Sequence, residues 1–167
     1  MPRYTVHYRF SQRFPFPAGD AYAWSTDFHV DDVALMGEEG TRKVDRIDDS
    51  TFILADTEKR GERSETKVRL VRLYPELLMW TNTRISEVGK HSQFIYQIVP
   101  EGVKGSRLEF TGAQLDEAAK QPSKAELAAA AKKYAETDAL AWMHLAEAMK
   151  KDLAPIRSRG TSRNRAR

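Results

Sequence analysis

Residues 123–153 read SKAELAAAAKKYAETDALAWMHLAEAMKKDL, the longest helical pattern in the chain. Alanine, leucine and long charged side chains dominate it, and these are strong helix formers. Ser123 and Glu126 form an S-x-x-E capping box at its start. We expect Pro155 to end the helix near Leu153, because proline lacks the backbone donor that a helix interior needs. The sequence therefore predicts one long helix that ends near residue 153.

One side of this helix is apolar. At 100° per residue, a coherent set of side chains falls within about 40° of Leu127. The set is Leu127, Ala131, Tyr134, Asp138, Ala141, Leu145 and Met149. A helix with such a stripe must pack on an apolar surface, so we expect it to cover the apolar face of a sheet.

The sheet is predicted from alternating apolar and polar residues before the helix. Residues 3–14 alternate in this way, which indicates a half-buried strand. After Pro15 and Pro17, short helices are expected from Gly19-Asp20 and over residues 31–36. Six further strand-like runs follow, at 41–47, 51–57, 64–73, 77–85, 92–99 and 106–114. Short turns between them favour antiparallel pairing of consecutive strands.

The two faces of this sheet are expected to differ. The apolar face should carry Phe52, Leu54, Val68, Leu70, Phe94, Tyr96, Ile98, Leu108 and Phe110. Glu65, Lys67 and Arg69 are expected on the opposite face, in water. Sixteen charged residues lie between positions 38 and 67. Because both signs alternate there, we interpret the segment as a solvated outer face and not as a nucleic-acid-binding stripe.

The order of these elements, together with residues 14–27, FPFPAGDAYAWSTD, resembles a known superfamily. It is the SRPBCC superfamily, which includes the polyketide cyclase/dehydrase and lipid-transport group, the StAR-related lipid-transfer domains and the birch pollen allergen family. The similarity covers about residues 3–153 and lies mainly in architecture. It implies an α+β helix-grip (START-like) fold, in which a curved antiparallel sheet of about seven strands wraps around a long helix. It also implies a deep, mainly apolar cavity between the two.

Asp138 is the sharpest anomaly in the sequence, because it places a carboxylate on an apolar stripe. One hypothesis makes it a polar anchor or general base in the cavity, with Tyr134 and Trp142 one turn away on either side. The other places it at the cavity mouth, either solvated or paired with Arg84 or Arg107.

Residues on the central strands are candidates for the cavity wall. They are Met79, Thr81, Thr83, Phe94, Tyr96 and Phe110. Apolar side chains with a few hydroxyls would orient a hydrophobic ligand. The alternative for each residue is ordinary core packing, which is the commoner role of alternating aromatic residues in strands.

Composition excludes several other classes. The chain has 167 residues, 41% of them hydrophobic and 31% charged, and no cysteine, so neither disulfides nor a thiolate nucleophile can form. The four histidines show no metal-binding spacing, and we interpret the acidic residues around His29 as helix caps. Serine-hydrolase, phosphate-loop and dinucleotide-binding motifs are missing from the sequence. No run is long and apolar enough to span a bilayer, so we expect a cytoplasmic protein.

The formal net charge of +3 conceals two different parts. Residues 1–155 carry 22 basic and 24 acidic side chains and are interpreted as the ligand-binding domain. Residues 156–167 are interpreted as a disordered basic tail. The tail holds Arg157, Arg159, Arg163, Arg165 and Arg167. These arginines could make weak contact with nucleic acid or an anionic membrane, or could be merely solvated.

We therefore expect a binding or carrier protein that holds a hydrophobic small molecule, such as a lipid, a quinone or a polyketide-like compound, beneath the long helix. One alternative is a cyclase/dehydrase-type enzyme acting in the same cavity through Asp138 or Tyr96. The other is a protein-interaction module like the chaperone activators of this superfamily. No cofactor or metal is expected, and the sequence leaves the oligomeric state open.

Overall fold

The computed structural model describes residues 1–86 and 91–158. Its elements follow the predicted order of strand, two short helices, six strands and a long helix. They are β1 (Arg3–Phe14), α1 (Ala18–Ser25), α2 (Asp32–Leu35), β2 (Gly40–Arg46), β3 (Thr51–Arg60), β4 (Arg63–Tyr74), the 3-10 helix η1 (Pro75–Leu77), β5 (Met79–Arg84), β6 (His91–Glu101), β7 (Gly105–Glu117) and α3 (Lys124–Ser158).

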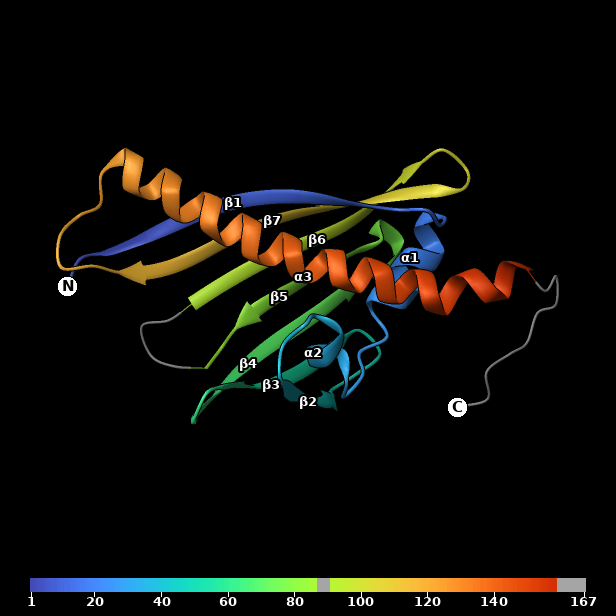
Figure 1. Cartoon of the computed structure of the whole chain (residues 1–167), viewed down its shortest axis with the longest axis horizontal. Helices are drawn as coiled ribbons and strands as arrows, with labels where there is room; N and C mark the ends of the chain where they lie inside the picture. Colours follow the sequence, from blue (N-terminus) through green and yellow to red (C-terminus); the bar gives the residue numbers. More distant parts are fainter. Residues whose placement is uncertain (87–90, 159–167) are drawn as a thin grey trace.

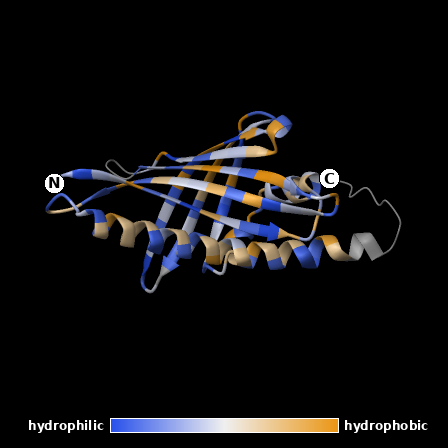
Figure 2. Cartoon of the chain, turned by 90° about the horizontal axis from the view of Figure 1, so that it is seen from above, coloured by the Kyte–Doolittle hydropathy of each residue, from blue (hydrophilic) through white to orange (hydrophobic). Residues whose placement is uncertain are grey.

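The seven strands form one antiparallel sheet with the order β1-β7-β6-β5-β4-β3-β2. Each neighbouring pair except β1 and β7 is consecutive in the chain, as short turns favour. Figure 1 shows α3 lying across the curved sheet, with α1 near β6 and β7 at one end and α2 beside β2 at the opposite edge. In Figure 2 the sheet and α3 form two layers. The predicted fold class is confirmed.

The start of α3 confirms the predicted capping box. The backbone N–H of Glu126 donates to Ser123 Oγ at 3.2 Å, and the backbone N–H of Ser123 donates to a Glu126 carboxylate oxygen at 2.7 Å. Among the described residues, no helix combines the length and apolarity needed to cross a bilayer.

The predicted end of this helix is wrong, because α3 continues through Pro155 to Ser158. A proline inside a helix removes one backbone hydrogen bond and kinks the helix, but it does not always end it. The helix thus crosses the expected boundary between domain and tail. Residues 159–167, with four of the five tail arginines, lie outside the described residues.

Aromatic side chains dominate the core between the sheet and α3. Phe10 and Phe110 stack with their ring centroids 4.5 Å apart, and Tyr8 packs against Phe110 at 5.4 Å. Phe110 is only 2% exposed. Burying one such side chain contributes about 1.5–3 kcal/mol. These contacts fix the face of the sheet that α3 covers.

The two faces of β4 are the reverse of those expected from the sequence. Val71 is fully buried whereas Leu70 is 38% exposed, so the face toward α3 carries the odd-numbered residues of this strand. Glu65, Lys67 and Arg69 therefore lie on the inner face, and Val68 and Leu70 on the outer one. Side chains alternate with period 2, so a wrong choice of phase moves every residue of the strand to the other face.

Candidate functional site

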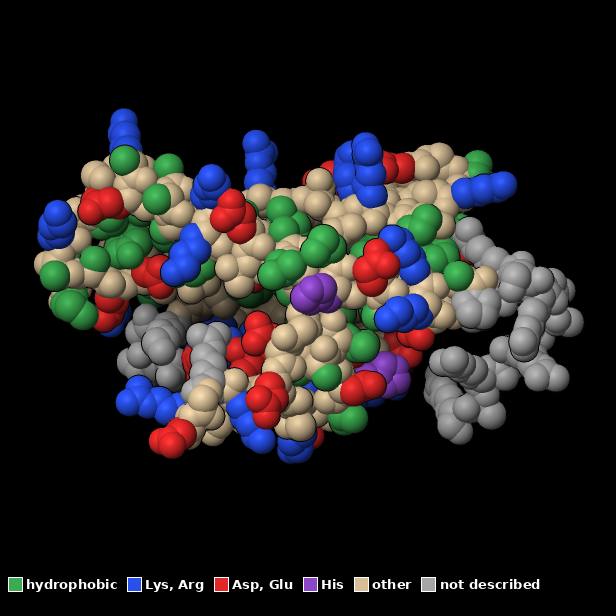
Figure 3. Space-filling view, viewed as in Figure 1, with side chains coloured by type: hydrophobic (Ala, Val, Ile, Leu, Met, Phe, Trp, Pro, Cys, Tyr) green, Lys and Arg blue, Asp and Glu red, His purple; other side chains and the backbone are tan. Residues whose placement is uncertain are grey.

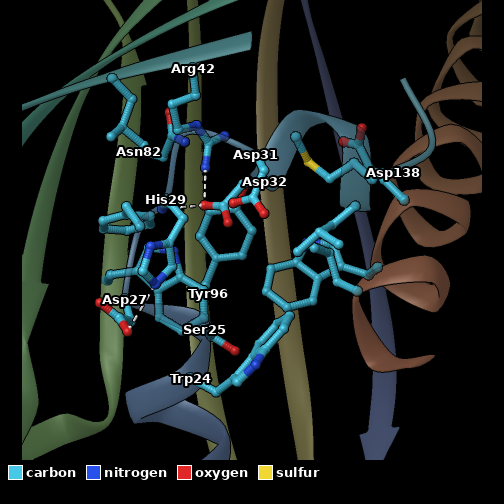
Figure 4. Close-up of a pocket in the computed structure, with 18 of the residues that line it drawn as sticks. Trp24, Ser25, Asp27, His29, Asp31, Asp32, Arg42, Asn82, Tyr96 and Asp138 are labelled. Atoms are coloured by element: carbon cyan, nitrogen blue, oxygen red, sulfur yellow. Dashed lines mark hydrogen bonds and ion pairs between the residues drawn. The ribbon is translucent and has the colours of Figure 1, made fainter. Parts of the chain in front are cut away.

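A cavity of about 780 Å³ lies between α3, the inner face of the sheet and the segment that carries α1 and α2. Figure 3 shows this face of the molecule hollowed along α3. Figure 4 shows residues from the α1–α2 segment, from β2, β5 and β6, and from α3 around one space. The cavity has two walls of different chemistry.

The first wall is aromatic and is formed by Trp80, Tyr96 and Trp142. Trp80 and Tyr96 are cross-strand partners, and their rings stack with centroids 4.8 Å apart and planes within 3° of parallel. Trp142 reaches them from α3, 5.7 Å from the ring of Tyr96. The three residues are almost buried, at 3–9% exposed, and the ring surface that remains at the cavity suits a flat apolar ligand.

The second wall is charged and comes from β2, β3 and β4. Asp56 is fully buried, and Arg42 donates to its two carboxylate oxygens at 2.6 and 2.9 Å. Arg69 donates to the same carboxylate. Arg42 also donates to Asp32 at 2.7 Å, which connects the sheet to α2. Beside them Lys67 pairs with Glu58 at 2.7 Å.

Strand register explains why these charges meet. Arg42 and Lys67 are the cross-strand neighbours of Asp56 on either side, so opposite charges face each other on one side of the sheet. Burial alone would raise the pKa of Asp56, but the hydrogen bonds and charges of Arg42 and Arg69 outweigh it and hold that pKa below its usual value. The interpretation of this segment as a solvated outer face is wrong for these residues.

Asp138 lies in the cavity, on α3, and its carboxylate accepts a hydrogen bond of 2.6 Å from the hydroxyl of Tyr8. The two arginines considered as its partners pair elsewhere, Arg84 with Glu65 and Arg107 with Glu101. Burial raises the pKa of Asp138, and the hydrogen bond from Tyr8 offsets part of this rise. Burial and the charge of Asp138 also raise the pKa of Tyr8. Both shifts favour the protonated forms of the two side chains.

Some polar atoms are buried without a hydrogen-bond partner in the described part of the chain. Ser25 Oγ and Asn82 Oδ1 belong to residues that line the cavity, and so does Arg69 Nε. An unsatisfied buried polar atom costs about 1–3 kcal/mol. Because these atoms have almost no accessible surface, a ligand could bond to them only after neighbouring side chains had moved.

Of the candidate residues expected from the sequence, some line this cavity, some lie elsewhere on the inner side of the sheet, and some face away from it. Phe94, Tyr96, Asp138 and Trp142 line the cavity. Tyr134 donates to Asp116 at 2.6 Å at the other end of the helix stripe, and Phe110 is buried in the core beside Tyr96. That any of them binds a ligand stays a prediction.

Met79 and Thr81, which were expected in the wall, are not there. Trp80 and Asn82 line the cavity instead, and Met79 and Thr81, which alternate with them in β5, point to the other face of the sheet. Thr83 is on that outer face as well. The expected phase of β5 was therefore wrong by one residue, as it was in β4.

Sequence reasoning also missed the charged wall and the aromatic residue Trp80. The signal is that Arg42, Asp56 and Arg69 lie on one face of three neighbouring strands, and it can be recognised only when those strands are placed in register. Charged residues are rarely fully buried, so the sequence alone favoured exposure.

The segment around His29 differs from the expected set of helix caps. Asp31 occupies the N-cap of α2 without a side-chain cap, while Asp32 accepts from the backbone N–H of His29 at 3.0 Å and from Arg42. His29 Nε2 lies 3.1 Å from Asp27 (Figure 4). Within residues 1–86 and 91–158, no three His, Asp or Glu side chains gather as a metal site would require.

Comparison with solved structures gives the fold. The Zhui aromatase/cyclase from Streptomyces sp. R1128 superimposes with a TM-score of 0.73 at 10% identity, over 95% of this chain and 100% of that one. Norcoclaurine synthase from Thalictrum flavum, in complex with dopamine and hydroxybenzaldehyde, gives 0.67 at 15% identity, over 96% and 91%. TTHA0849 from Thermus thermophilus gives 0.66 at 15% identity, over 88% and 99%.

These likenesses confirm the helix-grip fold. No protein-family model matches the sequence. No curated protein matches it either.

Proposed function

We propose that this protein binds a small, largely apolar molecule in the cavity of about 780 Å³ and acts as a carrier or sequestering protein in the cytoplasm. The observation that carries the proposal is the pairing of an aromatic wall with a wall of polar groups. The volume falls within the range of about 300–1,000 Å³ that is usual for small-molecule sites. Lipids, quinones and polyketide-like compounds are the candidate classes.

Charge narrows the choice of ligand. Eight carboxylates line the cavity, whereas its only lining cations within the described residues are Arg42, Lys67 and Arg69. These three cations already pair with Asp56, Glu58 and Asp32. An anionic ligand would meet an excess of negative charge, so neutral or cationic ligands are favoured. Two structural neighbours support a small aromatic ligand: one is an aromatase/cyclase, and the other was solved with dopamine and hydroxybenzaldehyde.

A fluorescence titration tests the proposal, because Trp24, Trp80 and Trp142 all line the cavity and are the three tryptophans of the chain. Menadione, a neutral quinone, should quench their emission saturably. Ala141→Phe adds a ring inside the cavity and should weaken menadione binding about tenfold or more, equivalent to about 1.4 kcal/mol.

Ala128→Phe is the matched control, because Ala128 is exposed on the same helix. The control should bind menadione like the wild type. Linear, non-saturating quenching, or the same dissociation constant for both helix variants, would contradict binding in the cavity. Native mass spectrometry of protein from its own host would then identify any molecule that copurifies.

A second candidate function, a cyclase/dehydrase-type enzyme, is favoured by the Tyr8–Asp138 pair. A carboxyl whose pKa is raised by burial is suited to general acid–base catalysis near neutral pH. Asp138→Asn keeps the size of the side chain but removes the titrating proton. If turnover of a polyketide-like substrate survives this change unaltered across pH, Asp138 has no catalytic role.

A further inference from the structure

A second cavity, of about 550 Å³, lies on the far side of Phe94 from the aromatic wall. It is bounded by the first half of α3 and by β1, β4, β5, β6 and β7. Its lining residues are Tyr8, Glu65, Lys67, Arg69, Arg84, His91, Ser92, Phe94, Gln114, Leu115, Asp116, Glu117, Tyr134 and Asp138. Its volume alone is sufficient for a ligand-sized group.

The two cavities adjoin. Lys67, Arg69, Phe94 and Asp138 line both of them. These four residues come from β4, β6 and α3, so the junction lies at the middle of the inner face. A molecule that spans both cavities must therefore pass these four side chains.

The second cavity differs from the first in chemistry. Ser92 and Gln114 are cross-strand partners on its floor, and Ser92 is only 5% exposed. Tyr134 and Asp116 form a hydrogen-bonded pair on its wall. Hydroxyl, amide and carboxylate groups here offer both donors and acceptors, and the tryptophan rings Trp80 and Trp142 line only the first cavity.

The junction itself contains an unsatisfied donor. Arg69 uses Nη1 to bind Asp56, but its Nε–H is buried without a partner in the described part of the chain. Asp138 accepts from Tyr8 through one oxygen and keeps acceptor capacity on the other. A ligand hydroxyl at this point could bond to the second carboxylate oxygen of Asp138, whereas Arg69 Nε would become reachable only if neighbouring side chains moved.

We propose that the ligand is elongated and spans both cavities, with an aromatic part against Trp80 and Trp142 and an uncharged chain rich in hydroxyl, carbonyl or ether oxygens in the second cavity. The inference rests on the proposed binding function and specifies the class of ligand. The second cavity carries charges of both signs, with Lys67, Arg69 and Arg84 facing Glu65, Asp116, Glu117 and Asp138. An uncharged polar chain can bond to both without leaving a buried charge unpaired.

The test compares three probes by the tryptophan titration described above. They are menadione, menadione bearing a short oligo(ethylene glycol) chain that ends in a hydroxyl, and menadione bearing an alkyl chain of equal length. The glycol probe should bind at least tenfold more tightly than menadione, and the alkyl probe should gain less. Equal affinities for menadione and the glycol probe, or an equal gain from the alkyl chain, would overturn the proposal.

Gln114→Phe tests whether the glycol chain of the probe lies in the second cavity, because the new ring fills that cavity on the side away from the aromatic wall. The variant should lose the tenfold gain of the glycol probe and keep the wild-type affinity for menadione. Gln93→Phe is the matched control on the exposed outer face of β6. Ser92→Leu is the second test if Gln114→Phe does not fold. Equal weakening of both probes in the folded variant would refute the second binding site.

Failure of this inference is distinguishable from failure of the proposed function. If menadione itself does not bind, the proposed function is wrong. If menadione binds and the glycol chain adds nothing, the function stands and the second cavity holds only water.

Discussion

Replacement of Asp56 by asparagine tests the charged wall most directly. Asp56 is fully buried and receives hydrogen bonds from Arg42 and Arg69. The side chains of these arginines are only 9% and 16% exposed. Asparagine keeps the shape but removes the negative charge, which leaves two buried guanidinium groups facing each other. Breaking a buried ion pair on one side in this way costs about 3–5 kcal/mol.

The loss is expected to be at the lower end of that range. Arg42 keeps Asp32 as a second partner, at 2.7 Å, whereas Arg69 has Asp56 as its one ion-pair partner within the described residues. Urea unfolding followed by circular dichroism measures the free energy of unfolding. Asp45→Asn is the control, because Asp45 lies in the neighbouring strand with its side chain 48% exposed. The control should change the free energy of unfolding by less than about 0.5 kcal/mol.

The pKa of Asp56 gives this prediction a second test. Since the folded protein holds this pKa below its usual value, the stabilising contribution of the carboxylate is present above the unfolded pKa of about 3.9 and is lost as the pH falls. The difference between wild type and Asp56→Asn should therefore shrink below about pH 4. A loss under about 1 kcal/mol at pH 7, or a difference independent of pH, would refute the assigned role of this network.

Two further predictions concern other buried positions. Burial raises the pKa of Asp138 in the folded protein. The contribution of this carboxyl to stability is therefore present below its unfolded pKa and is lost as the pH rises through its folded pKa. Each tenfold difference in proton affinity between the folded and unfolded protein corresponds to about 1.4 kcal/mol. Asp138→Asn should therefore gain stability relative to wild type between pH 4 and pH 7, and a constant difference would contradict the raised pKa. A Cβ at Gly112 would lie 2.9 Å from the ring of Tyr8, so Gly112→Ala should cost about 1–3 kcal/mol in thermal or urea unfolding. Gly19→Ala, in the open space of α1, should be neutral or stabilising, and an equal effect of the two substitutions would contradict the steric argument.

The strands and helices were largely predictable because their signals are local. The capping box at Ser123 lies within one turn of helix, and the turns between strands lie within a few residues. The position of Asp138 was predictable for the same reason, since α3 places it one turn from both Tyr134 and Trp142. Its partner was not, because Tyr8 is 130 positions away in the sequence.

The errors occurred where a local pattern allowed two answers. In β4 the apolar residues change phase between Leu70 and Val71, so the strand could present either side to the core. In β5 the aromatic Trp80 alternates with threonine and asparagine, and neither phase is clearly apolar. Only pairing with β3 and β6 decided which residues face α3, because Trp80 stacks on Tyr96.

The sequence by itself determined the antiparallel order of the strands, the long helix and the carboxylate on its apolar stripe. Tertiary structure alone decided that Arg42, Asp56 and Arg69 meet in a buried network, and that two cavities adjoin at Asp138. The physical reason is the range of the interactions. Helix periodicity and turn chemistry act over a few residues, whereas burial of a charge depends on partners that strand register brings together from distant positions.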